Sequence, residues 1–176
     1  MKRITMLGVL AAIVLYAAPV MAQSSFSAGL GVHFFRYDTT YLTALNATYL
    51  YELNEGLELN IGSEFGITTT KNEEDKTVPS FVIPVNVGLN FTFPQDRTTF
   101  VFGTGLTSVF NINPDTDEEF RFLMGPYVKG AMRVRVHPIM SWFVEAQQDL
   151  LIGGDDWINT GTRLATGINF SFERAD

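Results

Sequence analysis

The stretch that decides the fold is Phe120–Ile152, which reads FRFLMGPYVKGAMRVRVHPIMSWFVEAQQDLLI. Apolar and polar side chains alternate along it with a period of two, on both sides of a turn predicted at His137-Pro138. The charged residues of the polar parity are Arg121, Lys129, Arg133 and Arg135 before the turn, and Glu145 and Asp149 after it. A period of two is typical of paired strands with one apolar and one polar face.

The same alternation recurs in six other runs, at residues 25–35, 41–53, 57–69, 80–93, 99–112 and 163–173. Short turns at 54–56, 94–97 and 137–138 separate some of the runs, and longer, mostly acidic connections separate others. A chain that alternates short and long connections is expected to have tight turns at one end and loops at the other. These patterns predict an all-β, eight-stranded antiparallel up-and-down barrel.

The N-terminus has the features of a secretory signal peptide. Met1-Lys2-Arg3 precedes an almost wholly apolar run from Ile4 to Val20, and small residues follow at the expected cleavage site. We therefore predict a cleavable signal peptide over residues 1–22, cut after Ala22, and a barrel domain over residues 23–176. The alternative, an uncleaved anchor, is disfavoured because the run is marginal for crossing about 30 Å of hydrocarbon.

The bulk composition excludes several classes of protein. The formal net charge is −7, and removal of residues 1–22 takes away two bases and no acid. A chain this acidic is not expected to bind nucleic acid, because phosphate contact requires clustered Lys and Arg. The chain has no cysteine, so neither a disulfide nor a lipid-modified cysteine can form.

The composition of the two strand faces indicates which one is outside. The polar face is mostly Gly, Ser, Thr and Asn, whereas a soluble surface carries about 25–35% charged residues. The apolar face has aromatic residues near the strand ends, as expected of two girdles at the headgroup levels of a membrane. On the short-turn side they are Phe26, Tyr49, Tyr51, Phe91, Phe93, Phe100, Trp142, Phe170 and Phe172, and on the loop side Phe34, Tyr41, Phe65, Phe81, Phe110 and Phe122.

With its signal peptide, eight alternating runs, short turns and acidic loops, the chain resembles the small outer-membrane β-barrels of Gram-negative bacteria. This family includes outer membrane protein X, the barrel domain of outer membrane protein A and the opacity-like proteins. Two features depart from the pattern. The family usually ends on an aromatic residue, whereas four residues follow Phe172 here. Pro84 and Pro126 also interrupt predicted strands, and bulges near the loop rim are expected to absorb them.

If the apolar face is outside, charged residues fill the barrel and must pair, because isolated buried charges are costly. The predicted interior network comprises Glu52, Glu58, Glu64, Lys129, Arg133, Arg135, Glu145, Asp149 and Arg163, with Arg121 and Glu173 nearer the rims. Arg133 is expected opposite or diagonal to Glu145, and Lys129 near Asp149. Resemblance to the family also implies an interior closed by ion pairs, and eight strands leave little space beyond their side chains.

Candidate catalytic and metal-binding residues are few. A lipid hydrolase would need Ser, His and a carboxylate converging on the lipid-facing side. His137 lies at a turn near Ser141 of the inward parity, and His33 faces inward, so neither an enzyme nor a cofactor is predicted. The oxygen-rich loop residues that could bind a divalent cation are Asp115, Asp117, Glu118, Glu119, Asp155 and Asp156, without EF-hand spacing. Trp157 is a candidate contact for a partner or for lipid headgroups.

The sequence thus predicts a monomeric outer-membrane barrel with a plugged polar interior and both termini in the periplasm. By analogy of fold, its role is structural or adhesive, through contacts of its loops with lipopolysaccharide, a host surface or another protein. The alternatives are a small-solute or ion pore and a soluble, secreted lipocalin-like ligand-binding barrel with its apolar face inside.

Overall fold

The structure, a computed structural model, describes residues 23–35, 40–71, 77–112, 120–153 and 158–173. They form eight strands: β1 (Gln23–Phe35), β2 (Thr40–Asn54), β3 (Leu57–Lys71), β4 (Thr77–Gln95), β5 (Thr98–Ile112), β6 (Phe120–His137), β7 (Met140–Ile152) and β8 (Ile158–Glu173). Within these ranges, no helix is long and apolar enough to cross a membrane. The predicted signal peptide, the acidic loop residues at 115–119 and 155–156, and Trp157 lie outside the described residues.

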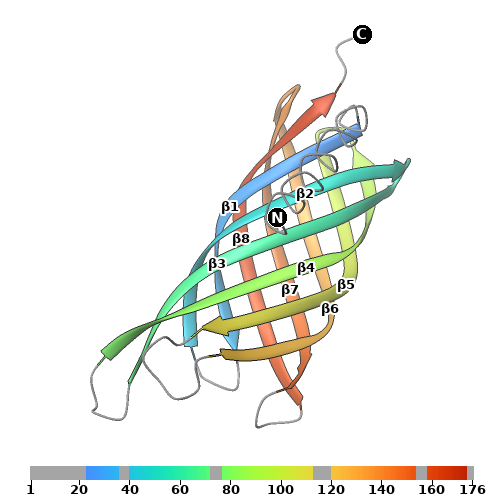
Figure 1. Ribbon diagram of the computed structural model, residues 1–176. Coiled ribbons are helices and arrows are strands. Elements are labelled where there is room, and N and C mark those ends of the chain that lie inside the picture. Colours follow the sequence, from blue (N-terminus) through green and yellow to red (C-terminus); the bar gives the residue numbers. More distant parts are fainter. Residues whose placement is uncertain (1–22, 36–39, 72–76, 113–119, 154–157, 174–176) are drawn as a thin grey trace, which may run out of the picture.

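The strands form one closed antiparallel barrel in sequence order, with β8 paired to β1 (Figure 1). Two-residue turns at 55–56, 96–97 and 138–139 lie at one end, where β1 also begins and β8 ends. Gly56 has a φ of 86° and Asp96 a φ of 51°, the left-handed conformation that tight hairpin turns require. We call this the short-turn end and the opposite one the loop end, and the predicted meander is confirmed.

The outer surface of the barrel is apolar, as predicted. Large side chains such as Phe102 and Leu45 are 61% and 62% exposed on it. All nine aromatic residues predicted for the short-turn girdle are exposed or half-exposed outward, and the register aligns Phe170, Phe26 and Tyr49 in one row across β8, β1 and β2. The outward Gln148 donates a 2.9 Å hydrogen bond to the Gly161 carbonyl of the next strand. Such hydrogen bonds satisfy polar groups on a surface where lipid hydrocarbon offers no hydrogen-bond partner.

The two strand prolines are accommodated without the expected bulges. Between β3 and β4 the pairing passes from Ser63–Val85 to Gly66–Val82 with no change of register around Pro84. The register is also unchanged around Pro126. Before it Met124 pairs with Ile152, and after it Tyr127 pairs with Asp149. Each proline interrupts the ladder only on the side where its missing N–H would have donated. Register shifts instead lie beside tight turns, between Glu52 and Asn54 and between Arg135 and His137.

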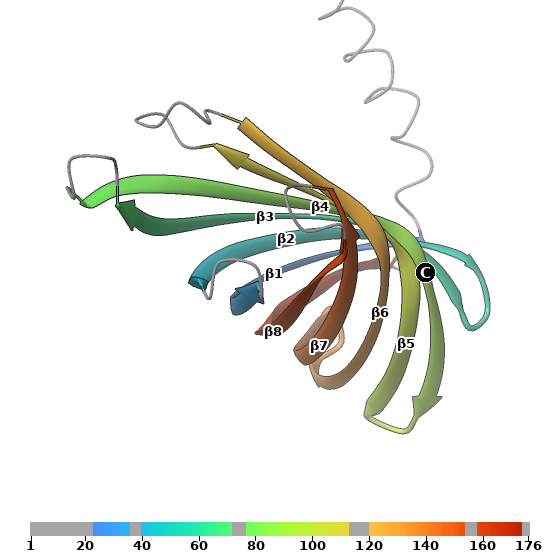
Figure 2. The ribbon, with the colours of Figure 1, turned by 90° about the horizontal axis from the view of Figure 1, so that it is seen from below.

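Two kinds of side chain fill the lumen at different heights. Near the loop end lies a cluster of buried apolar residues, which we call the apolar layer: Phe35, Val82, Val109, Leu123 and Leu151. Toward the short-turn end the interior becomes polar and charged. Figure 2 shows the ribbon of the barrel from the loop end. The residues of the apolar layer have the inward parity, which was predicted to be the polar face.

Candidate functional site

A charge network occupies the middle of the barrel. Arg163 on β8 forms ion pairs with Glu64 on β3 and with Glu145 on β7, so its guanidinium crosses the lumen. The Lys129 ammonium lies 3.1 Å from the other oxygen of Glu145. The side chains of Arg163 and Glu64 are only 5% and 2% exposed. Because each of these buried charges faces an opposite one, their desolvation is offset locally. We call these four residues the central network.

His33 and Asp149 extend this network toward the loop end. The two ring nitrogens of His33 lie 3.5 Å from a Glu64 oxygen and 3.1 Å from an Asp149 oxygen. Asp149 also accepts a 2.7 Å hydrogen bond from the side-chain amide of Gln147. His33 stacks on Phe35 with ring centroids 4.1 Å apart. The polar centre and the apolar layer are therefore in direct contact.

Tyr127 fills the lumen beside the central network. Its side chain is 1% exposed, and its hydroxyl accepts a 2.9 Å hydrogen bond from the Asn60 amide. The ring lies over the paired glycines Gly88 and Gly105, where an added Cβ would come within 2.4 Å of the hydroxyl and 2.9 Å of the ring. Glycine on these strands thus leaves room for a large side chain from β6.

Below the central network, toward the short-turn end, Arg133 and Glu58 form a pair across the lumen. Their two parallel contacts, Nη1 to Oε1 and Nη2 to Oε2, measure 2.7 and 2.8 Å. Glu58 also accepts a 3.3 Å hydrogen bond from Asn90. This two-point geometry is the strong form of the arginine–carboxylate interaction.

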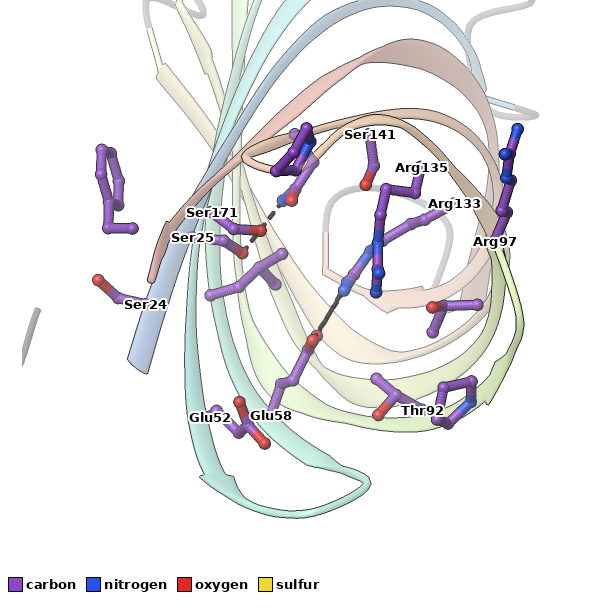
Figure 3. Close-up of a pocket in the computed structure, with 16 residues that line it drawn as sticks. Ser24, Ser25, Glu52, Glu58, Thr92, Arg97, Arg133, Arg135, Ser141 and Ser171 are labelled. Carbon is purple, nitrogen blue, oxygen red and sulfur yellow. Dashed lines mark hydrogen bonds and ion pairs between the residues drawn. The ribbon is translucent and has the colours of Figure 1, made fainter. Parts of the chain in front are cut away.

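Beyond that pair the lumen widens into a cavity of about 430 Å³ at the short-turn end, which we call the vestibule. Figure 3 shows Arg133 and Arg135 close together, Arg97 to their side, and Glu52 beyond Glu58. Its remaining wall is mostly hydroxyl, amide and proline side chains, among them Ser24, Ser25, Thr92, Thr99, Ser141, Ser171 and Asn169. Among the described residues, packed side chains thus occupy the lumen near the loop end and in the middle, and the lumen is hollow at the short-turn end.

Three backbone hydrogen bonds fasten the rim of the vestibule. The N–H groups of Thr92, Arg135 and Ser171 donate to the carbonyls of Gly56, Arg97 and Ile139, at 2.9, 2.7 and 3.0 Å. Each bond therefore joins a tight turn to the strand beyond it. The rim is held as a ring, which fixes the backbone positions of Arg97 and Arg135.

The ion partners differ from those expected from sequence. Arg133 lies opposite Phe143, so Glu145 is on its diagonal, but its guanidinium crosses the lumen to Glu58. Lys129 contacts Glu145, while Asp149 contacts His33 and Gln147. Glu52 and Arg135 were expected within the paired interior; both are exposed at the vestibule, because each lies next to a turn.

Sequence reasoning missed the place of several interior residues. His33 was predicted to face inward, and it does, but its contact with the central network was not expected. Tyr127 was not expected at the centre, and Arg97 was read only as a turn residue. Parity could have placed Tyr127 inside, because it alternates with Gly125 and Lys129. No local signal places Arg97 at a cavity, because turn residues have no strand parity.

The hydrolase candidates are not brought together, and the candidate cation ligands of the acidic loops lie outside the described residues. His137 is exposed beside its turn, Ser141 lines the vestibule, and among the described residues no hydrogen bond joins them. In the described ranges, no group of three or more His, Asp or Glu side chains is arranged to hold a metal ion.

The sequence matches no protein-family model and no curated protein. Its fold, however, matches solved structures. Neisserial surface protein A aligns over 85% of this chain and 96% of its own, with a TM-score of 0.66 and 10% identity. Outer membrane protein OprG of Pseudomonas aeruginosa aligns over 88% and 98%, with a TM-score of 0.57 and 10% identity. Ail of Yersinia pestis, solved with a heparin analogue, aligns over 84% and 97%, with a TM-score of 0.51 and 16% identity.

The closed barrel and its apolar outer surface define a membrane-spanning β-barrel. Its particular fold is that of the small eight-stranded outer-membrane proteins, as the resemblance predicted. At these identities the likeness establishes the fold and leaves the activity to the residues of this chain.

Proposed function

We propose that the protein is an integral outer-membrane barrel with a plugged, non-conducting interior. The observation that carries this proposal is the stacking of two different barriers in one narrow lumen, the apolar layer and the central network. An ion crossing the apolar layer would lose its hydration without gaining a polar partner. At the central network it would have to displace buried ion pairs, so each barrier opposes conduction for its own reason.

The test is the conductance of the purified, folded protein in planar bilayers. Wild-type protein inserted at high density is expected to give no stepwise current above the lipid baseline. A general porin inserted under the same conditions serves as the positive control. Reproducible unitary currents from the wild-type barrel would overturn the plugged reading.

A small-solute or ion pore is the second candidate. It is favoured by the vestibule, which leads inward to a void of about 20 Å³ bordered by Lys129, Arg133 and Glu145. Under this hypothesis the central network would open as a gate. Wild-type currents that change in size in a folded Arg163→Ala variant would support it.

We further propose that the protein lies in the outer membrane, in contact with lipid and lipopolysaccharide. Its role would be structural or adhesive, through the loops, and it would act as a monomer without nucleic-acid partners. The heparin analogue bound in the Ail structure makes a polyanionic host surface one partner class to test. Cleavage after Ala22 remains part of this proposal, because small residues end the apolar run there and polar sequence follows. Fractionation, heat-modifiable gel mobility and N-terminal sequencing test location and cleavage. A soluble periplasmic protein without a mobility shift would favour the lipocalin-like alternative.

A further inference from the structure

We propose that the vestibule at the short-turn end is a binding site for a small soluble anion with carboxylate or phosphate groups. The proposal rests on the cavity, on two arginines without a carboxylate partner, and on the fastened rim. It does not depend on conduction, because the vestibule lies on one side of both barriers.

The cavity has the dimensions of a ligand site. Its volume of about 430 Å³ lies within the range of roughly 300–1,000 Å³ typical of small-molecule pockets. Its depth comes from the lumen itself, since Arg133 and Glu58 form its floor. A ligand there would be surrounded by the barrel wall.

The charge balance of the cavity favours an anion. Arg133 and Glu58 neutralise each other, which leaves Arg97 and Arg135 against Glu52. Neither Arg97 nor Arg135 has an ion pair with a carboxylate among the described residues. Arginine presents a planar fork of donors that matches a carboxylate or phosphate in two-point contacts. This positive surface lies within a protein of net charge −7, so it is a local feature and not a consequence of composition.

The rest of the wall is suited to complete the coordination of an anion. Ser25, Ser141 and Thr99 hydroxyls line the cavity and can donate to ligand oxygens that the guanidiniums leave free. The hydrogen bond from the Arg135 N–H to the Arg97 carbonyl holds the two arginines on adjacent backbone. Because the rim backbone is fastened before binding, only side chains need to be ordered when the ligand enters.

The direct test is calorimetric titration of the full mature barrel, folded in zwitterionic micelles, with pyrophosphate and separately with citrate at constant ionic strength. Wild-type protein is expected to bind at least one probe with one-to-one stoichiometry. The Arg97→Gln/Arg135→Gln variant is expected to bind about a hundredfold more weakly, about tenfold for each charge-assisted hydrogen bond lost. The preferred probe indicates whether phosphate or carboxylate is recognised.

Two controls make the test specific. Arg121→Gln removes one positive charge at the other end of β6 and is expected to leave binding unchanged. Ser141→Trp fills the cavity while keeping both arginines and is expected to abolish binding, with the heat-modifiable gel shift confirming folding. Repeating the titration in nanodiscs containing phosphatidylglycerol asks whether a lipid headgroup competes and is the source of the phosphate. The site would be refuted if wild-type protein bound neither pyrophosphate nor citrate. It would also be refuted if Arg121→Gln weakened binding as much as the Arg97→Gln/Arg135→Gln variant does.

Discussion

At the scale of single residues, crowding decides where glycine is required. Gly88 and Gly105 are directly paired on β4 and β5, and the Tyr127 ring lies over them. An added Cβ at Gly88 would lie 2.3 Å from the Thr104 carbonyl oxygen, which is backbone and cannot swing away. Gly130, in contrast, has open space on the outer surface, with nothing within 4 Å of an added Cβ.

We predict that Gly88→Ala destabilises the barrel and that Gly130→Ala does not. The first change overpacks the lumen and is expected to lower the free energy of unfolding by about 1–3 kcal/mol or more. The second is expected to remain within about 0.5 kcal/mol of wild type, as for surface positions generally. Urea unfolding in micelles, followed by loss of the heat-modifiable band, measures both. Equal effects of the two substitutions would contradict the crowding argument.

At the scale of elements, alternation along the chain was enough to predict the strands and their connections. The partners of individual charges were not predictable in the same way. Arg133 and Glu58 are 75 residues apart and lie on β6 and β3, which are not neighbouring strands. Their contact depends on the diameter and shear of the closed barrel, and hairpin reasoning considers only adjacent strands. The prolines show the same limit, because whether a bulge forms depends on the partner strand.

Closure between the first and last strands can be tested by a cross-link. Ser25 on β1 and Ser171 on β8 are directly paired, and the chain has no other cysteine to interfere. The Ser25→Cys/Ser171→Cys variant is therefore expected to form an intramolecular disulfide on mild oxidation, seen as a band that stays compact on boiling until reductant is added.

The matched control is Ser25→Cys/Ser141→Cys. Ser141 is on β7, two strands from β1, and strands are spaced about 4.8 Å apart. Two such spacings exceed the roughly 7 Å limit on the distance between the Cα atoms of a disulfide. Efficient bridging of the control pair, or none in the Ser25–Ser171 pair, would be incompatible with the β1–β8 register.

At the scale of the whole molecule, the lumen is a sequence of layers that the pattern of residues revealed only in part. Its charges were visible on one strand parity, so a polar interior followed from the sequence. The apolar layer was not visible in the sequence, because Leu123 and Leu151 are each an apolar residue on a mostly polar strand face. They become a barrier only when closure brings them together with Val82, Val109 and Phe35. The vestibule likewise exists only once the short-turn end is assembled from all eight strands.

The last prediction is that the two barriers block conduction independently. Leu123→Ala/Leu151→Ala opens the apolar layer. Glu64→Ala/Arg163→Ala removes an opposite pair from the central network and leaves Glu145 its contact with Lys129. Each double variant is expected to stay silent in planar bilayers, because the other barrier persists, whereas the quadruple variant is expected to leak.

The matched control is Leu106→Ala/Leu164→Ala, which truncates two leucines of the outer surface, 56% and 49% exposed, and leaves the lumen intact. Each buried leucine truncation costs about 2–5 kcal/mol, so every variant is first shown to be folded by its heat-modifiable band. A quadruple variant that is folded yet silent would place the block elsewhere in the lumen. A leak of equal size from the leucine variant alone would mean that the central network opposes no ion, because its charges would then be lining an open path.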